Sequence, residues 1–280
     1  MKIINLGKSC EENAKFILAK KCRYCLQVIK VQGPVDDICI STECLALYDS
    51  SCKKKLSCGH QCYGCKDEKN CLHCLNSSCK NYVNCFGLDE DAYCAICYTE
   101  SLSCAPVIKL SCNHIFHLKC VLTKLENRWL SPKINFNHDN CESCKQWMSA
   151  PNNPDIQDLL NKDAELFELV KKKTLERMKF DGIDKDPRLS NKSDPYYSKP
   201  LEYGLHKCAY YMCYKCKKPY FAGLRDCAGG PADNQQNQNN ANKSFDPTHL
   251  ICGGCSDLSG VAGVTDCKKH GKVLHIFLIL

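Results

Sequence analysis

The most constraining feature of the sequence is a set of eight cysteine and histidine residues between residues 94 and 144. It reads Cys94-x2-Cys97-x14-Cys112-x-His114-x2-His117-x2-Cys120-x20-Cys141-x2-Cys144. Zinc prefers four tetrahedral sulfur and nitrogen ligands, and a two-residue gap lets both thiolates of one tight turn face the same ion. Eight ligands therefore predict two ions. Metal binding can then replace much of the apolar core that so short a stretch lacks.

The order and the gaps of these residues closely resemble the RING-H2 zinc domain. In that family the ligands interleave, which implies one ion held by Cys94, Cys97, His117 and Cys120 and another held by Cys112, His114, Cys141 and Cys144. The resemblance also implies that Ile96 contacts a ubiquitin-conjugating enzyme. We expect Trp129 to be a second candidate contact, because Val121, Leu125 and Trp129 recur at the spacing of one helix face. Simple core packing is the alternative role for Trp129.

Two positions differ from the common RING pattern. Glu142 stands where many RING domains have a proline, and Lys145 occupies the place of an arginine that locks the ubiquitin thioester. A lysine keeps the charge of that arginine but loses its two-pronged donor geometry. Cys104 and His138 fall outside the ligand pattern, and we expect both to bind no metal.

The cysteine usage predicts a reducing compartment. The chain has 27 cysteines and 9 histidines, and most lie in C-x2-C or mixed Cys/His clusters instead of the scattered spacing of a disulfide framework. The N-terminus lacks the apolar run of a secretory signal, so we expect a cytoplasmic protein, with the nucleus as an alternative. The apolar run at 273–280 is too short to span a bilayer, and no membrane partner is expected.

The formal charge of +7 would ordinarily suggest nucleic acid as a partner. Metal-bound cysteines are thiolates, however, and the formal count omits their negative charge. We therefore give the basic balance little weight and expect no nucleic-acid partner.

Upstream of residue 89 the sequence divides into two parts. An N-terminal segment, 1–35, contains one C-x2-C pair, Cys22 and Cys25, which is half of a zinc site with unnamed partners. A Cys/His-rich module, 36–88, centres on a Cys-Gly-His-x-Cys core that resembles B-box and NF-X1 fingers. It contains enough ligands for two ions. Its candidate ligands are Cys58, His60, Cys62, Cys71 and Cys74, and the spacing leaves their pairing open.

Downstream of the RING-like domain (89–150) the sequence predicts a helix and a linker. Asn153 and Pro154 are typical of a helix start, and apolar residues recur at helical spacing to Gly182, which predicts an amphipathic helix over 152–182. The stretch 183–204 is polar and contains three prolines, Pro187, Pro195 and Pro200, so we expect a linker.

The last part, 205–280, contains further ligand pairs and one isolated thiol. The pairs are Cys213 with Cys216, Cys252 with Cys255, and Cys267 with His270. Cys227 lies alone on a glycine-containing stretch, in a loop expected over 223–248. A lone thiol on such a loop is a candidate nucleophile. The alternatives are a spare zinc ligand or an inert thiol.

Several separated motifs together resemble the C-terminal end of the Pam/Highwire proteins, which are Myc-binding ubiquitin ligases of the RING-Cys-relay class. They are Cys-Ala-Ile-Cys, Cys-Asn-His-Ile-Phe-His-Leu-Lys-Cys, Glu-Asn-Arg-Trp-Leu, Ala-Tyr-Tyr-Met-Cys-Tyr-Lys-Cys, Leu-Ile-Cys-Gly-Gly-Cys-Ser-Asp and Cys-Lys-Lys-His-Gly. The resemblance implies a tandem cysteine zinc domain after the RING and makes Cys227 the upstream relay cysteine. The chain ends ten residues after His270, so we expect the downstream relay cysteine and its base to be absent.

We therefore expect small zinc-stabilised α+β modules: a cross-brace RING-H2 domain, an amphipathic helix and a partial tandem cysteine domain. The expected function is that of a ubiquitin-protein transferase, which recruits a ubiquitin-charged conjugating enzyme and accepts ubiquitin as a thioester on Cys227. The sequence does not indicate the substrate protein. One alternative is an adaptor RING that promotes direct transfer to lysine. Another is a zinc-dependent binding or inhibitory module without catalysis.

Overall fold

The computed structural model describes residues 20–79, 89–129, 131–224 and 246–255 in full, together with the backbone of two strands at 264–267 and 271–274. The chain divides into two compact units. Unit 1 comprises Met1–Glu126 and Asp139–Leu160, and unit 2 comprises Asn127–His138 and Asn161–Leu280. The elements are small and mixed, and cysteines gather in several clusters among them, which confirms the predicted class of zinc-stabilised α+β modules.

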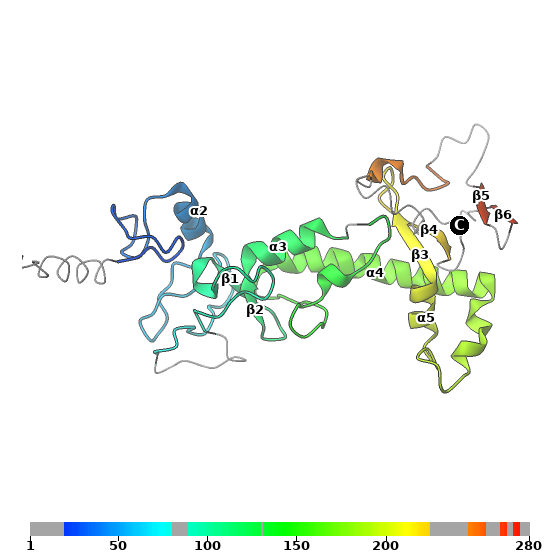
Figure 1. Ribbon diagram of the computed structural model, residues 1–280, viewed down its shortest axis with the longest axis horizontal. Helices are drawn as coiled ribbons and strands as arrows, with labels where there is room; N and C mark the ends of the chain where they lie inside the picture. The colour runs from blue at the N-terminus through cyan, green and yellow to red at the C-terminus, as the bar shows by residue number, and fades with distance from the viewer. Residues whose placement is uncertain are drawn as a thin grey trace, which may run out of the picture. The chain divides into compact units, whose positions relative to one another are not determined.

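The first described part of unit 1 is a small module around helix α2 (Thr42–Ser50) (Figure 1). Its core is built from Cys22, Tyr24, Ile38 and Cys44. The chain after α2 forms a short irregular hairpin, whose bridges pair Ser51 with Cys65 and Lys55 with Gln61. So few apolar residues could not hold this module alone, which is the situation in which metal ions supply folding energy.

The RING-like part of unit 1 consists of a two-stranded sheet and a helix. Strand β1 (Val107–Lys109) pairs antiparallel with β2 (Ile115–His117), and helix α3 (Leu118–Asn127) follows directly. Two 3-10 turns, η1 (Leu102–Cys104) and η2 (Asn137–Asp139), flank these elements. The buried core includes Leu102, Val107, Ile108, Leu110, Ile115, Phe116, Val121, Leu125, Met148, Ile156 and Leu160.

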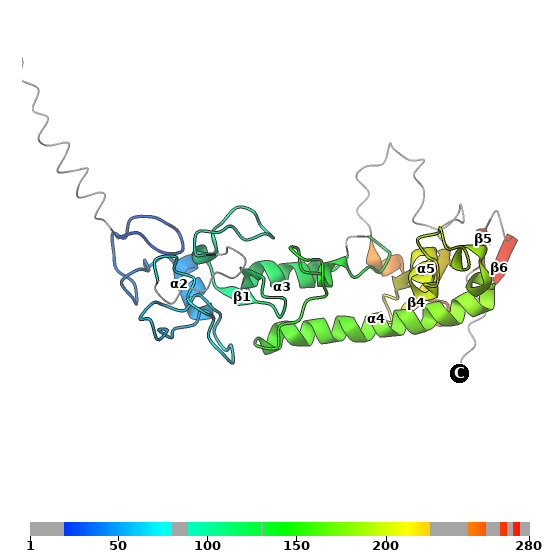
Figure 2. The same ribbon diagram turned by 90° about the horizontal axis from the view of Figure 1, so that it is seen from below.

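Helix α4 (Pro154–Asp181) is continuous, and the predicted amphipathic helix is present (Figure 2). The side chain of Asn153 accepts a hydrogen bond of 3.1 Å from the Ile156 backbone N–H, and Pro154 stands at the first helical position. This combination is favourable because the first turn of a helix lacks internal acceptors for its N–H groups. Gly182, with a left-handed φ of 71°, follows the last residue of the helix.

Unit 2 continues through η3 (Ile183–Lys185), η4 (Pro187–Leu189) and helix α5 (Pro200–Lys207). Strands β3 (Cys208–Met212) and β4 (Pro219–Leu224) then form an antiparallel hairpin. The turn η5 (Pro247–His249) follows, and strands β5 (Val264–Cys267) and β6 (Gly271–Leu274) form another antiparallel pair. The core of this unit joins Ile134, Val170, Cys208 and Tyr210.

The stretch 183–204, expected to be a linker, contains helical turns held by specific contacts. Tyr203 is 1% exposed, and its hydroxyl donates to Asp186 Oδ2 over 2.5 Å. Gly204 lies so close to α4 that a Cβ there would collide with Met178 Sδ and Thr174 Cγ2. Prolines in this stretch start helical turns, since a first-turn proline needs no N–H acceptor. Among the described residues, no helix is both long and apolar enough to cross a bilayer.

Candidate metal centres

The structure gathers cysteine and histidine side chains into groups whose ligand atoms lie within 4.8 Å of one another. Five of the groups contain four residues each. They are Cys22/Cys25/Cys39/Cys44, Cys58/His60/Cys74/Cys79, Cys94/Cys97/His117/Cys120, Cys112/His114/Cys141/Cys144 and Cys213/Cys216/Cys252/Cys255. The two groups between residues 94 and 144 have the interleaved membership that the RING resemblance implies.

The sulfur-to-sulfur distances fit zinc. A tetrahedral ion with Zn–S bonds of about 2.3 Å places its sulfurs about 3.8 Å apart. The Sγ atoms of Cys22 and Cys44 are 3.7 Å apart, and those of Cys216 and Cys252 are 3.8 Å apart. A disulfide would bring two sulfurs to about 2.05 Å, and these cysteines are free. The donor sets therefore suit a metal ion that prefers thiolate and imidazole ligands.

Most of the C-x2-C turns share one backbone geometry. The residue that follows the second cysteine is left-handed in four of them: Leu26 (φ 59°), Tyr98 (φ 57°), Lys145 (φ 60°) and Lys217 (φ 56°). Each of these residues donates its N–H to the carbonyl of the first cysteine over 2.8–2.9 Å. A left-handed backbone costs a non-glycine residue about 1–2 kcal/mol, and the repeated turn aims two thiols at one point. We call this turn the metal knuckle.

The first RING-like group lies where β2 ends and α3 begins. His117 Nδ1 lies 3.7 Å from Cys97 Sγ and 3.8 Å from Cys120 Sγ. Its other nitrogen, Nε2, lies 2.9 Å from the Ser101 carbonyl oxygen. A carbonyl only accepts, so Nε2 carries the proton and Nδ1 presents its lone pair to the metal position.

The second RING-like group uses a different local motif. His114 Nδ1 lies 3.4 Å from Cys112 Sγ, and the residue between them, Asn113, is left-handed with φ 69°. The group Cys58/His60/Cys74/Cys79 repeats this motif, because Gly59 has φ 85° between Cys58 and His60. The Cys-x-His spacing therefore places both ligands on one side of a tight turn.

Each of the five groups contains at least one thiol with a lowered pKa, and the first RING-like group contains two, Cys94 and Cys97. For Cys22, Cys97 and Cys213, burial opposes ionisation, but hydrogen bonds, mainly from backbone amides, outweigh it and bring the pKa to about 6. The backbone and side chain of His60 lower the pKa of Cys58 to about 6, and the Gln146 amide leads the lowering of the Cys144 pKa. Because the thiolate is the form that binds metal, each group offers at least one thiol that ionises readily.

Several ligands could not be named from the sequence. Cys39 and Cys44 complete the group of Cys22 and Cys25, and the Cys39 N–H donates to Cys22 Sγ over 3.5 Å. This group joins residues from both sides of the boundary expected at residue 35. Cys79 completes the group of Cys58, His60 and Cys74. Neither Cys39 nor Cys79 forms a C-x2-C pair, so spacing alone carries no signal for them.

Other candidate residues lie outside these groups. Cys62 and Cys71 are not members of the five, although both lie in the same module. The backbone of Cys267 ends β5, and its side chain lies outside the described residues. Cys227 and His270 lie outside the described residues altogether. The sulfur of Cys104 lies 3.2 Å from Ser101 Oγ, and His138 Nε2 lies 3.1 Å from Asp163 Oδ2.

The two expected enzyme contacts have different surroundings. Ile96 is partly buried against the core of unit 1. Trp129 lies beyond α3, which ends at Asn127, and the left-handed Arg128 (φ 47°) breaks the helix. The expectation that Trp129 shares a helix face with Val121 and Leu125 is therefore wrong. Its ring instead lies 5.8 Å from that of His138, in unit 2.

The last RING-like knuckle contains a small ion-pair network. Glu142 Oε1 lies 2.7 Å from Lys124 Nζ, and Glu142 Oε2 lies 2.8 Å from Lys145 Nζ. Hydrogen bonds from Lys124 and Lys145 lower the Glu142 pKa. Glu142, which stands where many RING domains have a proline, therefore has its negative charge balanced by Lys124 of α3 and by Lys145 of the knuckle.

Comparison with known proteins finds no matching family model. The chain is 38% identical over 251 residues to the E3 ubiquitin-protein ligase MYCBP2 of Danio rerio, and 34% identical over 261 residues to the E3 ubiquitin-protein ligase highwire of Drosophila melanogaster. These alignments cover 89% and 90% of this chain but only 5% of each relative's length. Over nearly its whole length, the chain is homologous to one short segment of these very large proteins, and it belongs to the Pam/Highwire family.

Proposed function

We propose that this chain promotes ubiquitin transfer by docking a ubiquitin-charged conjugating enzyme on its RING-like part. The observation that carries the proposal is the interleaved pair of four-ligand groups between Cys94 and Cys144. Two curated relatives named as E3 ubiquitin-protein ligases support it, although the chain spans only 5% of each. The reducing compartment that so many free thiols favour is the cytoplasm, with the nucleus as an alternative.

We assign the docking surface to the first RING-like metal knuckle, at Cys94 and Cys97, and to the region around the last one, at Cys141 and Cys144. Ile96 lies between Cys94 and Cys97, and Tyr98, which follows them, is 73% exposed. An exposed aromatic residue beside an aliphatic one is typical of a protein-binding surface. Trp129 stays a candidate contact, held from the side by the His138 ring.

The test is single-turnover discharge of a pre-charged conjugating enzyme onto free lysine, with the full chain in zinc-containing buffer. Ile96→Ala is expected to slow discharge about ten-fold, because loss of a central interface hydrophobe costs more than 1 kcal/mol. Tyr214→Ala is the matched control, since Tyr214 is an exposed side chain of an equivalent knuckle in unit 2. If the wild-type chain accelerates discharge from no conjugating enzyme, the proposal of ubiquitin transfer is wrong and the chain acts as a zinc-dependent binding module.

The finer proposal is that Cys227 accepts ubiquitin. A Cys227 thiolate would attack the thioester carbonyl of the charged enzyme, form a new thioester and release the enzyme's cysteine as a thiolate. Support comes from the family resemblance and from the isolation of Cys227 in the sequence. A reducible ubiquitin adduct on wild type, absent from Cys227→Ser and present on Cys208→Ser, is the expected result. Lysine discharge without any adduct would favour the adaptor RING instead.

A further inference from the structure

The hairpin that follows α2 has a defined register. Backbone N–H groups of Cys52, Cys62 and Leu56 donate to the carbonyls of Gly64, Lys54 and His60 over 2.8–3.0 Å. Ser51 therefore pairs with Cys65, and Lys55 with Gln61. Paired residues of antiparallel strands point to one face, and the face alternates along each strand. Cys65 thus lies on the face of Ser51, whereas Cys52 and Cys62 share the opposite face with Gly64.

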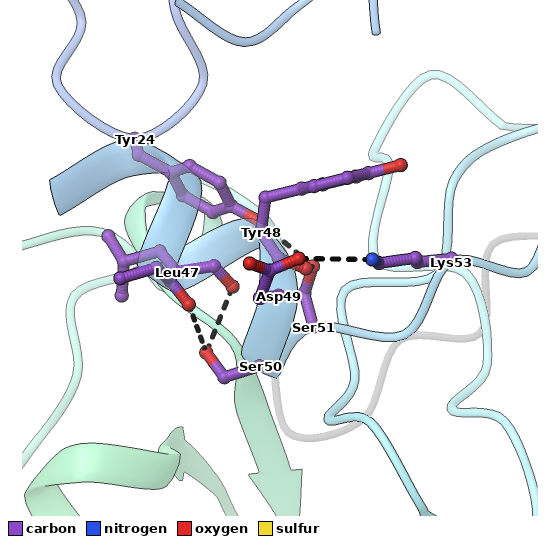
Figure 3. Close-up of polar contacts among 8 residues, drawn as sticks. Tyr24, Leu47, Tyr48, Asp49, Ser50, Ser51 and Lys53 are labelled. Carbon is purple, nitrogen blue, oxygen red and sulfur yellow. Dashed lines mark hydrogen bonds and ion pairs between the residues drawn. The ribbon is translucent and has the colours of Figure 1, made fainter. Parts of the chain in front are cut away.

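Side-chain contacts agree with this division. Ser51 Oγ accepts a hydrogen bond of 3.0 Å from the Tyr24 hydroxyl, and Lys53 Nζ lies 3.2 Å from Asp49 Oδ1. Figure 3 shows the Ser51 hydroxyl beside the Tyr24 hydroxyl and the Lys53 side chain directed at Asp49 of α2. On the same face, the Cys65 thiol donates to the Val107 carbonyl over 3.2 Å. The Cys62-x2-Cys65 pair is not a metal knuckle, since the residue after it is absent from the left-handed positions.

Three thiols meet on the opposite face. The Sγ atoms of Cys52 and Cys71 are 3.8 Å apart, which is the spacing of two thiolates on one zinc ion. Cys71 also interacts with the Cys62 thiol. Cys62 Sγ accepts the Gly64 N–H over 3.4 Å, a contact that orients it toward this face. Cys52 and Cys62 are buried, at 8% and 0% exposure, whereas Cys71 is exposed, so an ion held here would be shielded from water on the side of the hairpin.

The carboxylate of Glu68 lies beside Gly64, next to the Cys62 end of this face. A Cβ at Gly64 would collide with Glu68 Oε2 and would lie 3.3 Å from Cys62 Sγ, so the carboxylate fills the space above the glycine. Glu68 Oε2 accepts the Cys65 N–H over 3.3 Å. Glu68 Oε1 is buried and has no hydrogen-bond partner among the described residues. A buried carboxylate oxygen without a partner is costly, and a cation would satisfy it.

We propose that Cys52, Cys62 and Cys71 bind a further Zn²⁺ ion with Glu68 as the fourth ligand. Three thiolates and one carboxylate make a donor set that zinc accepts. Lys54, on the same face of the hairpin, offsets part of the excess negative charge. Cys65, although it completes a C-x2-C pair, is not a ligand.

The ion would have a structural role. Its ligands come from both strands of the hairpin and from residues 68–71, so it would fix the segment that leads into the group of Cys58, His60, Cys74 and Cys79. Coordination would be closed by four protein ligands, which is typical of structural zinc.

The first test measures the zinc content of the purified full chain by elemental analysis. Cys71→Ser is expected to lose one equivalent of zinc relative to wild type, and Cys65→Ser is expected to lose none. The other metal groups provide an internal reference for correct folding. A Cys71→Ser protein with the full zinc content, or a Cys65→Ser protein that lacks one equivalent, would overturn the site.

The second test addresses the carboxylate. Glu68→Gln and Gly64→Ala are both expected to release one equivalent of zinc to a chelator at least ten-fold faster than wild type. No left-handed φ constrains Gly64, so its alanine variant tests crowding of the carboxylate. Glu68→Cys is expected to restore slow release by supplying a fourth thiolate. If Glu68→Gln releases zinc as slowly as wild type, Glu68 is not the fourth ligand.

Discussion

At the scale of single residues, the backbone of the metal knuckles carries strain that a bound ion can sustain. Leu26, Tyr98, Lys145 and Lys217 are all left-handed, yet none is a glycine or an asparagine. Such a conformation persists only when its surroundings impose it. In each knuckle a backbone hydrogen bond to the first cysteine and the shared ion would provide that constraint.

Leu26 offers a direct test of this strain, since its side chain is 58% exposed and makes little packing contribution. Leu26→Gly is expected to slow metal release, because glycine adopts φ 59° without steric cost. Leu26→Val is expected to accelerate release by several-fold, because a β-branched residue is a strong outlier there. Release is measured with a chromogenic chelator. Ile40→Val is the control, since Ile40 is also exposed but is not among the left-handed residues.

At the scale of secondary-structure elements, unit 2 depends on close contact between α4 and α5. Gly204 faces Met178 and Thr174 of α4, and Tyr203 beside it is buried. Tyr203 also joins α5 to the turn that contains Asp186. The polar, proline-containing stretch is therefore ordered. Gly204 permits the close approach of α5 to α4, and the Tyr203 hydrogen bond holds α5 to the turn at Asp186.

Gly204→Ala is expected to destabilise unit 2 by about 1–3 kcal/mol, the usual effect of overpacking a close contact. The measurement is the urea midpoint of unfolding followed by tryptophan fluorescence, with zinc held constant. Glu202→Ala is the matched control, because that side chain on the same helix is 62% exposed. Equal midpoints for Gly204→Ala and Glu202→Ala would contradict the described packing.

Tyr203→Phe should cost about 1 kcal/mol through the lost hydrogen bond to Asp186. The effect has a defined pH dependence. The hydrogen bond from Tyr203, followed by that from the Arg188 amide, lowers the Asp186 pKa below its usual value of 3.8. Because the folded pKa is the lower one, the stabilisation is complete above about pH 4 and is lost as pH falls through the folded value. Denaturant titrations of both proteins at several pH values should show the difference closing only in acid.

At the scale of the whole molecule, the sequence indicates local metal turns but not their tertiary partners. The C-x2-C and C-x-H spacings predict which neighbouring side chains share an ion, because a tight turn brings them together without help from the rest of the fold. Cys39, Cys44 and Cys79 reach their groups only through folding, so no local spacing predicts them. Cys62 and Cys65 show the opposite case. They have C-x2-C spacing, which predicts a shared ion, but strand alternation turns their side chains to opposite faces.

The recognition of the family from separated motifs is confirmed by homologues that match about nine-tenths of the chain. The end of α3 was not predictable from periodicity, because a single left-handed residue, Arg128, stops a pattern that continues to Trp129. Local spacing and family motifs therefore predict which residues form the two RING-like metal groups. The ligand pairing in the upstream module depends on strand register and tertiary folding, which spacing does not reveal.

The proposed function requires that the metal-bound modules present a surface which promotes ubiquitin transfer. The most direct measurement compares single-turnover discharge of a charged conjugating enzyme by the purified chain, by the chain stripped of metal, and by the stripped chain after zinc is returned. We expect acceleration with the purified chain, its loss after stripping, and its recovery with zinc, because thiolate clusters such as Cys112/His114/Cys141/Cys144 cannot hold their loops without an ion. Acceleration that survives complete metal removal would show that the transfer-promoting surface does not depend on bound metal.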